Sequence, residues 1–237
     1  MKFECCIETI TEALIAKKYR ADRVELCAAL DIGGLTPSYG LIKAGAALQS
    51  PEVHVMIRPR GGNFIYSPDE LSIMKEDIIL AKAAGAKGVV FGVLDQNDNI
   101  NEQAVISLAD VALQLDLRLT FHRAFDQVSD TSTALQFLVS AGFHRILTSG
   151  GAKTALGGKT LLSQLASEAN GKIEIMAGGG VSAANAAELL DAGVDALHFS
   201  IRKNQSTGQE GMGNDYTVDE NKVTLFLSAV GKAGHSI

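Results

Sequence analysis

The sequence predicts an α/β fold that consists of one (β/α)8 barrel. Eight apolar runs of strand length begin near residues 2, 22, 53, 88, 118, 144, 173 and 195, and helical patterns fill the intervals between them. Strands that alternate with helices pair in parallel, and eight such units close into a barrel. The length of 237 residues suits one barrel, so we expect a single domain over residues 1–237.

The first three strands are expected over Lys2–Glu8, Asp22–Cys27 and Val53–Arg60, and each carries polar side chains toward its end. Ser67-Pro68 then marks the start of a helix, because serine caps helix N-termini and proline suits the first helical position. Gly85 marks the end of that helix, since glycine commonly follows the last helical turn.

The second half of the chain repeats the same unit. The fifth strand ends in Thr120–Arg123, the sixth and seventh run into glycine turns, and the eighth ends in His198 and Ser200. Residues 203–217 are polar and glycine-rich, so we expect a mobile loop there. Apolar residues recur at helical spacing over residues 219–232, which predicts a last helix that closes the barrel.

Composition and charge restrict the class of protein. The chain is 46% hydrophobic, carries a formal net charge of −6 and has no basic tract, so a nucleic-acid-binding surface is not expected. No apolar run approaches the roughly 18 residues that a membrane span requires. Three cysteines, with no apolar leader ahead of the first strand, predict a cytoplasmic protein with reduced thiols.

Alternation along the strands predicts a polar barrel interior. In the third strand, Val53, Val55 and Ile57 share one face that suits the surrounding helices, so the opposite face should point toward the barrel axis. The same reasoning places the following side chains inside: Glu4, Cys6, Glu25, Cys27, His54, Met56, Arg58, Arg60, Thr120, His122, His198 and Ser200.

Buried carboxylates need positively charged or hydrogen-bonding partners. We therefore expect Arg58 or a neighbouring donor to neutralise Glu4 and Glu25, while Arg60 remains the more accessible arginine. The alternative for Glu4 is a purely structural ion pair, and for His54 it is a satisfied histidine of the core.

Four residues are candidates for catalysis because they lie near strand ends, where barrel enzymes carry their chemistry. These are Glu25, Arg58, His122 and Asp126. His122 suits acid–base chemistry because the pKa of histidine lies near neutrality. Asp126 follows it by four residues, and it could either orient His122 or pair with Arg123.

The glycine turns predict an anion site. Ser149, Gly150 and Gly151 follow the sixth strand, and Gly178–Gly180 follow the seventh and open a helix. Clustered glycines expose backbone N–H groups, and a helix start adds a partial positive charge. With Arg60 as the cation, we expect these residues to hold a small anion. The alternative is that the glycines only allow tight turns.

Two cysteines are candidate metal ligands. Cys6 and Cys27 occupy equivalent Glu-x-Cys positions on neighbouring strands, and such strands lie about 4.8 Å apart. At matching height the two thiols could share one soft ion such as Cu(I), assisted by Met56 or His122. The alternative is two small buried apolar side chains, and Cys5 should point to the opposite face.

Several of these segments together resemble the CutC family, which is named for copper homeostasis. The resemblance rests on Met56–Phe64, Thr120–Asp126, Leu147–Gly151, Arg23–Cys27 with Gly33–Ser38, and Met176–Val181, and covers about residues 2–202. It implies a TIM barrel, a cytosolic homo-oligomer and a role in copper tolerance. Copper binding in the family is attributed to cysteines, which correspond here to Cys6 and Cys27.

Two functions therefore remain open from the sequence. The first is a cytosolic Cu(I)-binding protein of copper homeostasis that uses Cys6 and Cys27. The second is a metal-independent barrel enzyme of the lyase, isomerase or hydrolase type that acts on a small phosphorylated or carboxylated metabolite. In that case Arg58 and Arg60 would clamp the substrate, and Glu25 or His122 would transfer protons.

Overall fold

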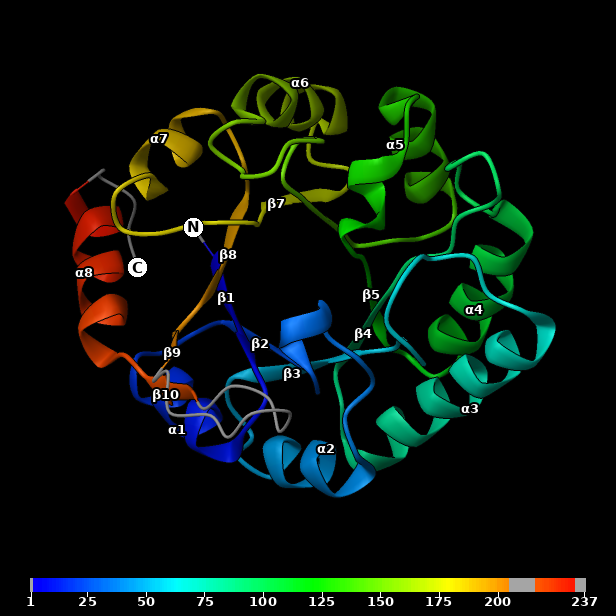
Figure 1. The fold of residues 1–237 in the computed structure, drawn as a ribbon, viewed down its shortest axis with the longest axis horizontal. Coiled ribbons are helices and arrows are strands. Elements are labelled where there is room, and N and C mark those ends of the chain that lie inside the picture. Colours follow the sequence, from blue (N-terminus) through cyan, green and yellow to red (C-terminus); the bar gives the residue numbers. More distant parts are fainter. Residues whose placement is uncertain (1, 205–215, 233–237) are drawn as a thin grey trace.

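The computed structural model describes residues 2–204 and 216–232, and it contains a closed barrel of eight parallel strands in the order β1 to β8. Figure 1 shows the helices arranged around the outside of the strands. The prediction of a single (β/α)8 barrel is confirmed. The barrel strands are β1 (Lys2–Ile7), β2 (Arg23–Leu26), β3 (Glu52–Met56), β4 (Gly88–Phe91), β5 (Arg118–Phe121), β6 (Arg145–Thr148), β7 (Glu174–Ala177) and β8 (Ala196–Ser200).

The connections are mostly α-helical, with two 3-10 turns at the end of the barrel where the strands terminate. The α-helices are α1 (Ile10–Lys18), α2 (Tyr39–Ala46), α3 (Pro68–Ala84), α4 (Glu102–Gln114), α5 (Thr131–Ser140), α6 (Lys159–Ala169), α7 (Ala186–Asp191) and α8 (Glu220–Lys232). The 3-10 turns are η1 (Leu30–Ile32) and η2 (Arg123–Gln127).

The ends of α3 follow the expected chemistry. The side chain of Ser67 accepts a hydrogen bond from the backbone of Glu70, and the Glu70 carboxylate accepts one from the backbone of Ser67. Gly85 adopts φ of 104°, a left-handed conformation that glycine reaches without a steric penalty. The predicted third strand was too long, because β3 ends at Met56 and the chain continues as a loop through Arg58 and Arg60.

The main core lies between the strands and the ring of helices. Val53, Val55 and Ile57 belong to it together with Met74 and Ile78 of α3, which confirms the predicted outward face of β3. Two small apolar clusters lie apart from this core, one made of Cys27, Met56 and Val90 and the other of Leu147, Met176 and Ala196.

The C-terminal part covers one side of the barrel. Arg202–Asn204 (β9) pairs antiparallel with Tyr216–Val218 (β10), so both ends of the expected loop over 203–217 belong to a two-stranded sheet. Residues 205–215 lie outside the described part of the chain. Phe226 of α8 stacks on Phe199 with ring centroids 4.0 Å apart, and it packs against Phe3. Across the described ranges, every helix is too short or too polar to span a membrane.

Candidate functional site

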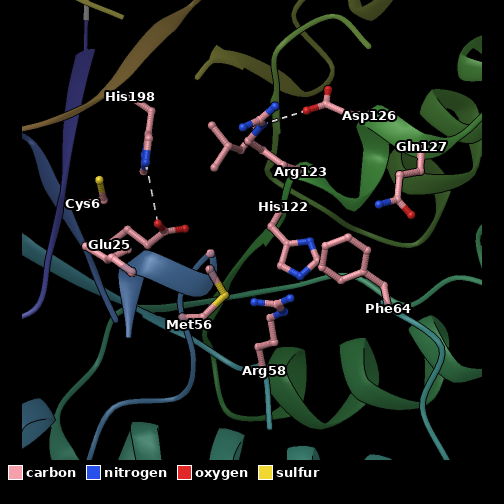
Figure 2. Close-up of a pocket in the computed structure, with 13 residues that line it drawn as sticks. Cys6, Glu25, Met56, Arg58, Phe64, His122, Arg123, Asp126, Gln127 and His198 are labelled. Carbon is pink, nitrogen blue, oxygen red and sulfur yellow. Dashed lines mark hydrogen bonds and ion pairs between the residues drawn. The ribbon is translucent and has the colours of Figure 1, made fainter. Parts of the chain in front are cut away.

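A cavity of about 380 Å³ opens where the barrel strands end, and it is the candidate functional site (Figure 2). A volume of this size suits a small metabolite. The lining residues are Cys6, Glu25, Leu30, Gly33, Met56, Arg58, Phe64, His122, Arg123, Asp126, Gln127, Leu147 and His198. Strand alternation therefore brought six of the predicted interior side chains to one place, namely Cys6, Glu25, Met56, Arg58, His122 and His198.

Two carboxylates and an imidazole form a buried chain on one wall. His198 Nδ1 lies 3.0 Å from Glu4 Oε1, and His198 Nε2 lies 3.7 Å from Glu25 Oε2. Burial alone would lower the pKa of His198, but Cys6, Glu25 and Glu4 raise it well above its usual value. Burial and the charge of Glu4 raise the pKa of Glu25 despite the opposing effect of His198. Glu25 therefore lines the cavity with a pKa that its surroundings raise.

Glu4 forms an ion pair with Arg23, the residue opposite it on the neighbouring strand. Arg23 Nε donates to Glu4 Oε2 at 3.0 Å, and both side chains are almost fully buried. Although burial would raise it, the pKa of Glu4 is held well below its usual range by His198, Arg23 and Arg145. Of the two expected partners of Glu4, Arg58 or a neighbouring donor, the structure shows neighbouring donors, namely Arg23 and His198.

Arg58 instead holds the loops around the cavity. Its Nη1 donates to the carbonyls of Ile32 and Gly34, at 2.9 and 3.0 Å, and its Nη2 donates to Gly62 at 2.8 Å. Register explains why it cannot reach Glu4. Glu4 is level with Arg23 and, through it, with Glu52, so Arg58 lies six residues farther along the chain, beyond the end of β3.

His122 is a neutral imidazole. Its Nδ1 accepts a hydrogen bond from the backbone N–H of Ala124, so the ring proton resides on Nε2. Burial and the nearby Arg58 charge lower the pKa of His122 to about 3. The ring lies against Phe64 with centroids 4.7 Å apart. Gly92 makes room for it, because a Cβ there would lie 2.7 Å from the imidazole.

The low pKa of His122 predicts that the stability of the folded protein depends on pH. Its pKa rises from about 3 in the folded protein to an ordinary 6.5 on unfolding, so the unfolded chain binds more protons between these values, and stability decreases as the pH falls. We expect His122 to account for a loss of about 2 kcal/mol between pH 7 and pH 5. Urea denaturation at both pH values checks this.

The matched variant in that experiment is His122→Gln, which should show a flatter pH dependence. The comparison is needed because His198 acts in the opposite direction: its raised pKa gives stability that increases slightly as pH falls toward 6.5. Equal pH dependence in wild type and His122→Gln would contradict the assignment of a neutral His122.

Asp126 fills the glycine turn after β6. Its Oδ1 accepts from the Thr148 hydroxyl and from the backbone N–H groups of Ser149 and Gly151, at 2.9 and 3.3 Å for the latter two. Asp126 also forms an ion pair with Arg123 at 2.8 Å, which was one of its two predicted roles. The other predicted role was to orient His122, but His122 Nδ1 accepts from the backbone of Ala124 instead. The two N–H groups proposed to bind an external anion are therefore already engaged by an internal carboxylate.

The cation beside the glycine turns is Arg123. Its Nη2 donates to the Ser149 hydroxyl at 2.9 Å, and a Cβ at Gly179 would lie 3.3 Å from its guanidinium carbon. Arg60 donates instead to Glu70, Asn63 and Ile65 on its own side of the barrel, and it is 39% exposed. Anion binding by Arg60, Ser149–Gly151 and Gly178–Gly180 remains a prediction, and Arg123 is the arginine that lies beside Ser149 and Gly179.

The two candidate metal ligands are staggered along the barrel. Strand register pairs Cys6 with Glu25, so Cys27 lies two residues beyond the partner of Cys6. The prediction of matching height is wrong, because two residues correspond to roughly 7 Å along a strand. Cys27 packs beside Met56, and a Cβ at Gly34 would touch both side chains. Cys5 belongs to the outer core, as expected.

The Cys27 thiol is protonated in this environment. Burial, Glu25 and Cys6 raise the pKa of Cys27 well above its usual value. Within the described residues, no three side chains of the His, Cys, Asp and Glu types are grouped in a way that could hold a metal ion. Binding of a soft ion by Cys6 and Cys27 stays a prediction.

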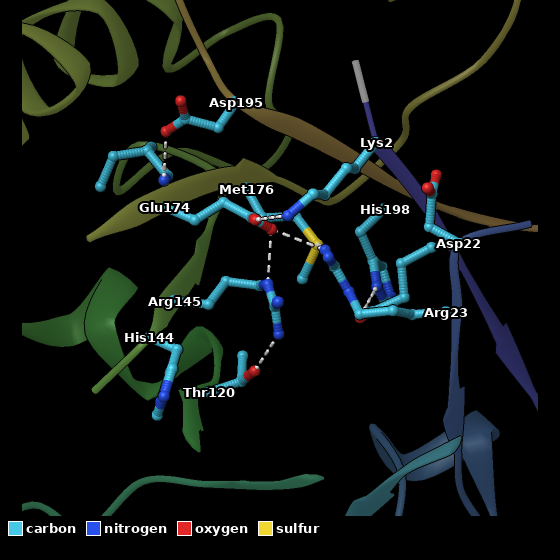
Figure 3. Close-up of polar contacts among 12 residues, drawn as sticks. Lys2, Asp22, Arg23, Thr120, His144, Arg145, Glu174, Met176, Asp195 and His198 are labelled. Atoms are coloured by element: carbon cyan, nitrogen blue, oxygen red, sulfur yellow. Dashed lines mark hydrogen bonds and ion pairs between the residues drawn. The ribbon is translucent and has the colours of Figure 1, made fainter. Parts of the chain in front are cut away.

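Sequence reasoning missed the ion network on the floor of the barrel (Figure 3). Glu174 Oε1 accepts from Arg23 and from Arg145, at 2.6 Å each, and Arg145 also donates to Thr120. The signal was present: Arg23 lies two residues before Glu25, and Arg145 two before Leu147, so both share the parity of interior positions.

A family model assigns the chain. The model described as the CutC family matches residues 1–203. The chain belongs to the CutC family. The resemblance found in the sequence is thereby confirmed, and the family match extends from β1 through most of β9.

Similar proteins agree with this assignment. A family protein CutC from Glaesserella parasuis is 44% identical over 203 residues, with 85% of this CutC chain and 83% of the relative covered. A human protein named copper homeostasis protein cutC homolog is 42% identical over 208 residues, covering 87% of this chain and 76% of the relative.

Solved structures agree on the fold. A CutC structure from Streptococcus agalactiae has a TM-score of 0.79 and 40% identity, and the match covers 84% of this chain and 98% of that one. A thiamine phosphate pyrophosphorylase from Pyrococcus furiosus matches with a TM-score of 0.61 at 15% identity, covering 98% of this chain and 96% of that one. The second likeness shows only that the two share a barrel fold.

Proposed function

We propose that this CutC family member acts in copper homeostasis by binding Cu(I) at the mouth of its barrel. The single observation that supports the proposal is the placement of soft ligands there. Cys27 and Met56 pack together, and Cys6 lines the adjoining cavity from the neighbouring strand. Thiolate and thioether sulfurs are the ligands that Cu(I) prefers. The relatives named for copper homeostasis support the same role.

The stagger of the two cysteines defines the expected character of the site. The Cys27 thiol must lose a proton that burial and Glu25 help to retain, so binding should weaken as the pH falls. Figure 2 shows Cys6 and Met56 on different walls of the cavity, with Glu25 between them. We infer a site of moderate affinity in which Cu(I) is cargo rather than a structural ion.

Anaerobic Cu(I) titration against a chromophoric chelator tests this proposal. Wild type should take up one equivalent, and affinity should fall between pH 8 and pH 6. The Cys6→Ser/Cys27→Ser variant should lose this binding. Cys5→Ala is the matched control, since the third cysteine faces the outer core. Undiminished binding by the double variant, or an equal loss in Cys5→Ala, would rule out this copper site.

We further propose that the protein works in the cytoplasm as a homo-oligomer. All three cysteines are free thiols. Large apolar side chains are exposed on the neighbouring helices α3 and α4, namely Ile73, Leu80, Ile106 and Leu113. Such a patch suits a contact between subunits. Light scattering should give a mass above that of one chain, and Leu80→Lys/Ile106→Lys should reduce it to the monomer value.

A further inference from the structure

In the part of the chain that the structure describes, three side chains that line the cavity carry a buried polar atom without a hydrogen-bond partner, namely Glu25 Oε1, Arg58 Nε and His122 Nε2. Glu25 Oε1 and His122 Nε2 are both enclosed, and neither forms a hydrogen bond within the described residues. Both side chains line the 380 Å³ cavity, and they come from different strands, β2 and the end of β5 (Figure 2). A buried polar group without a hydrogen-bond partner destabilises the folded protein. Two such groups in one cavity therefore indicate that they bind a ligand.

The two atoms have opposite hydrogen-bonding roles. His122 Nε2 carries a proton because Nδ1 accepts from Ala124, so it can only donate. The depressed pKa of the ring keeps it a neutral donor at physiological pH. Glu25 uses Oε2 toward His198 and the Cys27 thiol, which leaves Oε1 as an acceptor. The site thus presents one donor and one carboxylate oxygen to the same occupant.

The carboxylate is held in place from behind. His198 lies between Glu25 and Glu4, and Glu4 is anchored in turn by Arg23. His122 is held by its bond to Ala124 and by the Phe64 ring. Leu30, Met56 and Leu147 add apolar side chains to the lining. Fixed donors and acceptors in an apolar cavity are the arrangement that stabilises charge developing during a reaction.

We propose that this cavity binds a small α-hydroxy aldehyde or ketone and catalyses its enolisation, with Glu25 as base and His122 as the hydrogen-bond donor to the carbonyl oxygen. The Glu25 carboxylate removes the proton from the carbon next to the carbonyl. The C–H electron pair forms the C=C bond, and the carbonyl π pair moves to oxygen, where His122 Nε2–H stabilises it.

The step balances without an oxidant or a metal. Glu25 returns its proton to the neighbouring carbon while a proton moves between the two oxygens, so the hydroxyl-bearing carbon becomes the carbonyl and the original carbonyl becomes an alcohol. The overall reaction is an aldose–ketose isomerisation. Reversal at the first carbon instead exchanges its hydrogen with solvent, which gives a readout that needs no knowledge of the natural substrate.

Hydrogen exchange measured by NMR in D₂O tests the proposal. The probes are glycolaldehyde, glyceraldehyde and dihydroxyacetone, with glyceraldehyde 3-phosphate and dihydroxyacetone phosphate as their charged counterparts. The full-length protein is used with a Cu(I) chelator present, so a negative copper titration and a negative exchange experiment remain separate results. At least one probe should exchange its α-hydrogen at least about 100-fold faster than in buffer.

The variants assign the two roles. Glu25→Gln and His122→Phe should each reduce exchange by about 100-fold or more, whereas His122→Gln, which restores an amide donor, should retain more activity than His122→Phe. Exposed Glu102→Gln and His144→Gln are the matched controls and should leave exchange unchanged. Circular dichroism establishes that each variant is folded. If Glu25→Gln does not fold, Glu25→Asp, with its carboxylate withdrawn by one methylene, should slow exchange instead.

Three outcomes would overturn the proposal. One is exchange by wild type at the buffer rate for all five probes. Another is wild-type exchange in folded Glu25→Gln or Glu25→Asp together with folded His122→Phe. The third is exchange that occurs only in a parallel sample without the chelator, because the proposed chemistry uses only the side chains of this chain.

Discussion

Arg23→Ala is expected to lower the free energy of unfolding by about 3–5 kcal/mol, because it removes one partner from a buried ion network. Arg23 is only 3% exposed, and it bridges Glu4 and Glu174 at 3.0 and 2.6 Å. Its loss leaves the Glu4 carboxylate inside the barrel with His198 as the remaining close partner. Urea denaturation at pH 7 measures the change.

Arg118→Ala is the matched control for this prediction. Arg118 also opens a barrel strand, but it is exposed, so its removal should cost less than about 1 kcal/mol. The cost in Arg23→Ala arises from a stranded charge, so adding Glu4→Gln should recover part of the loss. If Arg23→Ala and Arg118→Ala have the same denaturation midpoint, the network does not carry this stability.

The fold was predictable because its signals are local. Each strand is an apolar run bounded by a turn, and α3 begins and ends at the cap residues that the sequence indicates, Ser67 and Gly85. The eightfold repetition then leaves the closed barrel as the natural arrangement. Strand ends were less predictable: β3 stops at Met56, and the backbone of the following Arg58 bonds to Thr36 instead of to a barrel strand.

The sequence was sufficient to predict which residues line the candidate site, but not which of them contact one another. Alternation of side chains is fixed by the backbone, so the interior positions of Cys6, Glu25 and His198 followed from parity alone. Pairing depends on strand register, which no local pattern encodes. The register sets Cys6 opposite Glu25 rather than Cys27. It also places Glu4 beside Arg23, far below Arg58.

The Asp126 contact illustrates a second limit. Glycines after a strand predict free N–H groups, but whether those groups await a ligand depends on which side chain folds over them. Here the short turn η2 directs Asp126 back into the turn after β6, where Ser149 and Gly151 donate to it. A carboxylate three residues from Arg123 thus plays the part that the sequence suggested for an external anion.

Arg58→Ala is expected to destabilise the protein by about 3 kcal/mol or more, whereas Arg60→Ala should cost about 1 kcal/mol or less. Arg58 is 4% exposed and donates to three loop carbonyls, each of which would lose its partner. Arg60 is much more exposed, so water can replace its contacts with Glu70 and Ile65. Equal denaturation midpoints for the two variants would contradict this ranking.

Arg58→Lys separates the geometry of Arg58 from its charge. If the side chain served mainly to neutralise a carboxylate, lysine would restore most of the stability. The structure predicts only partial recovery, because one ammonium cannot reach the carbonyls of Ile32, Gly34 and Gly62 as the planar guanidinium does.

The charge of Arg58 has a second effect that lysine should preserve: together with burial, it keeps the pKa of His122 low. Titration of the His122 ring nitrogens by NMR should therefore show a raised pKa in Arg58→Ala and a smaller change in Arg58→Lys. An unchanged His122 pKa in a folded Arg58→Ala variant would mean that burial alone keeps this imidazole neutral.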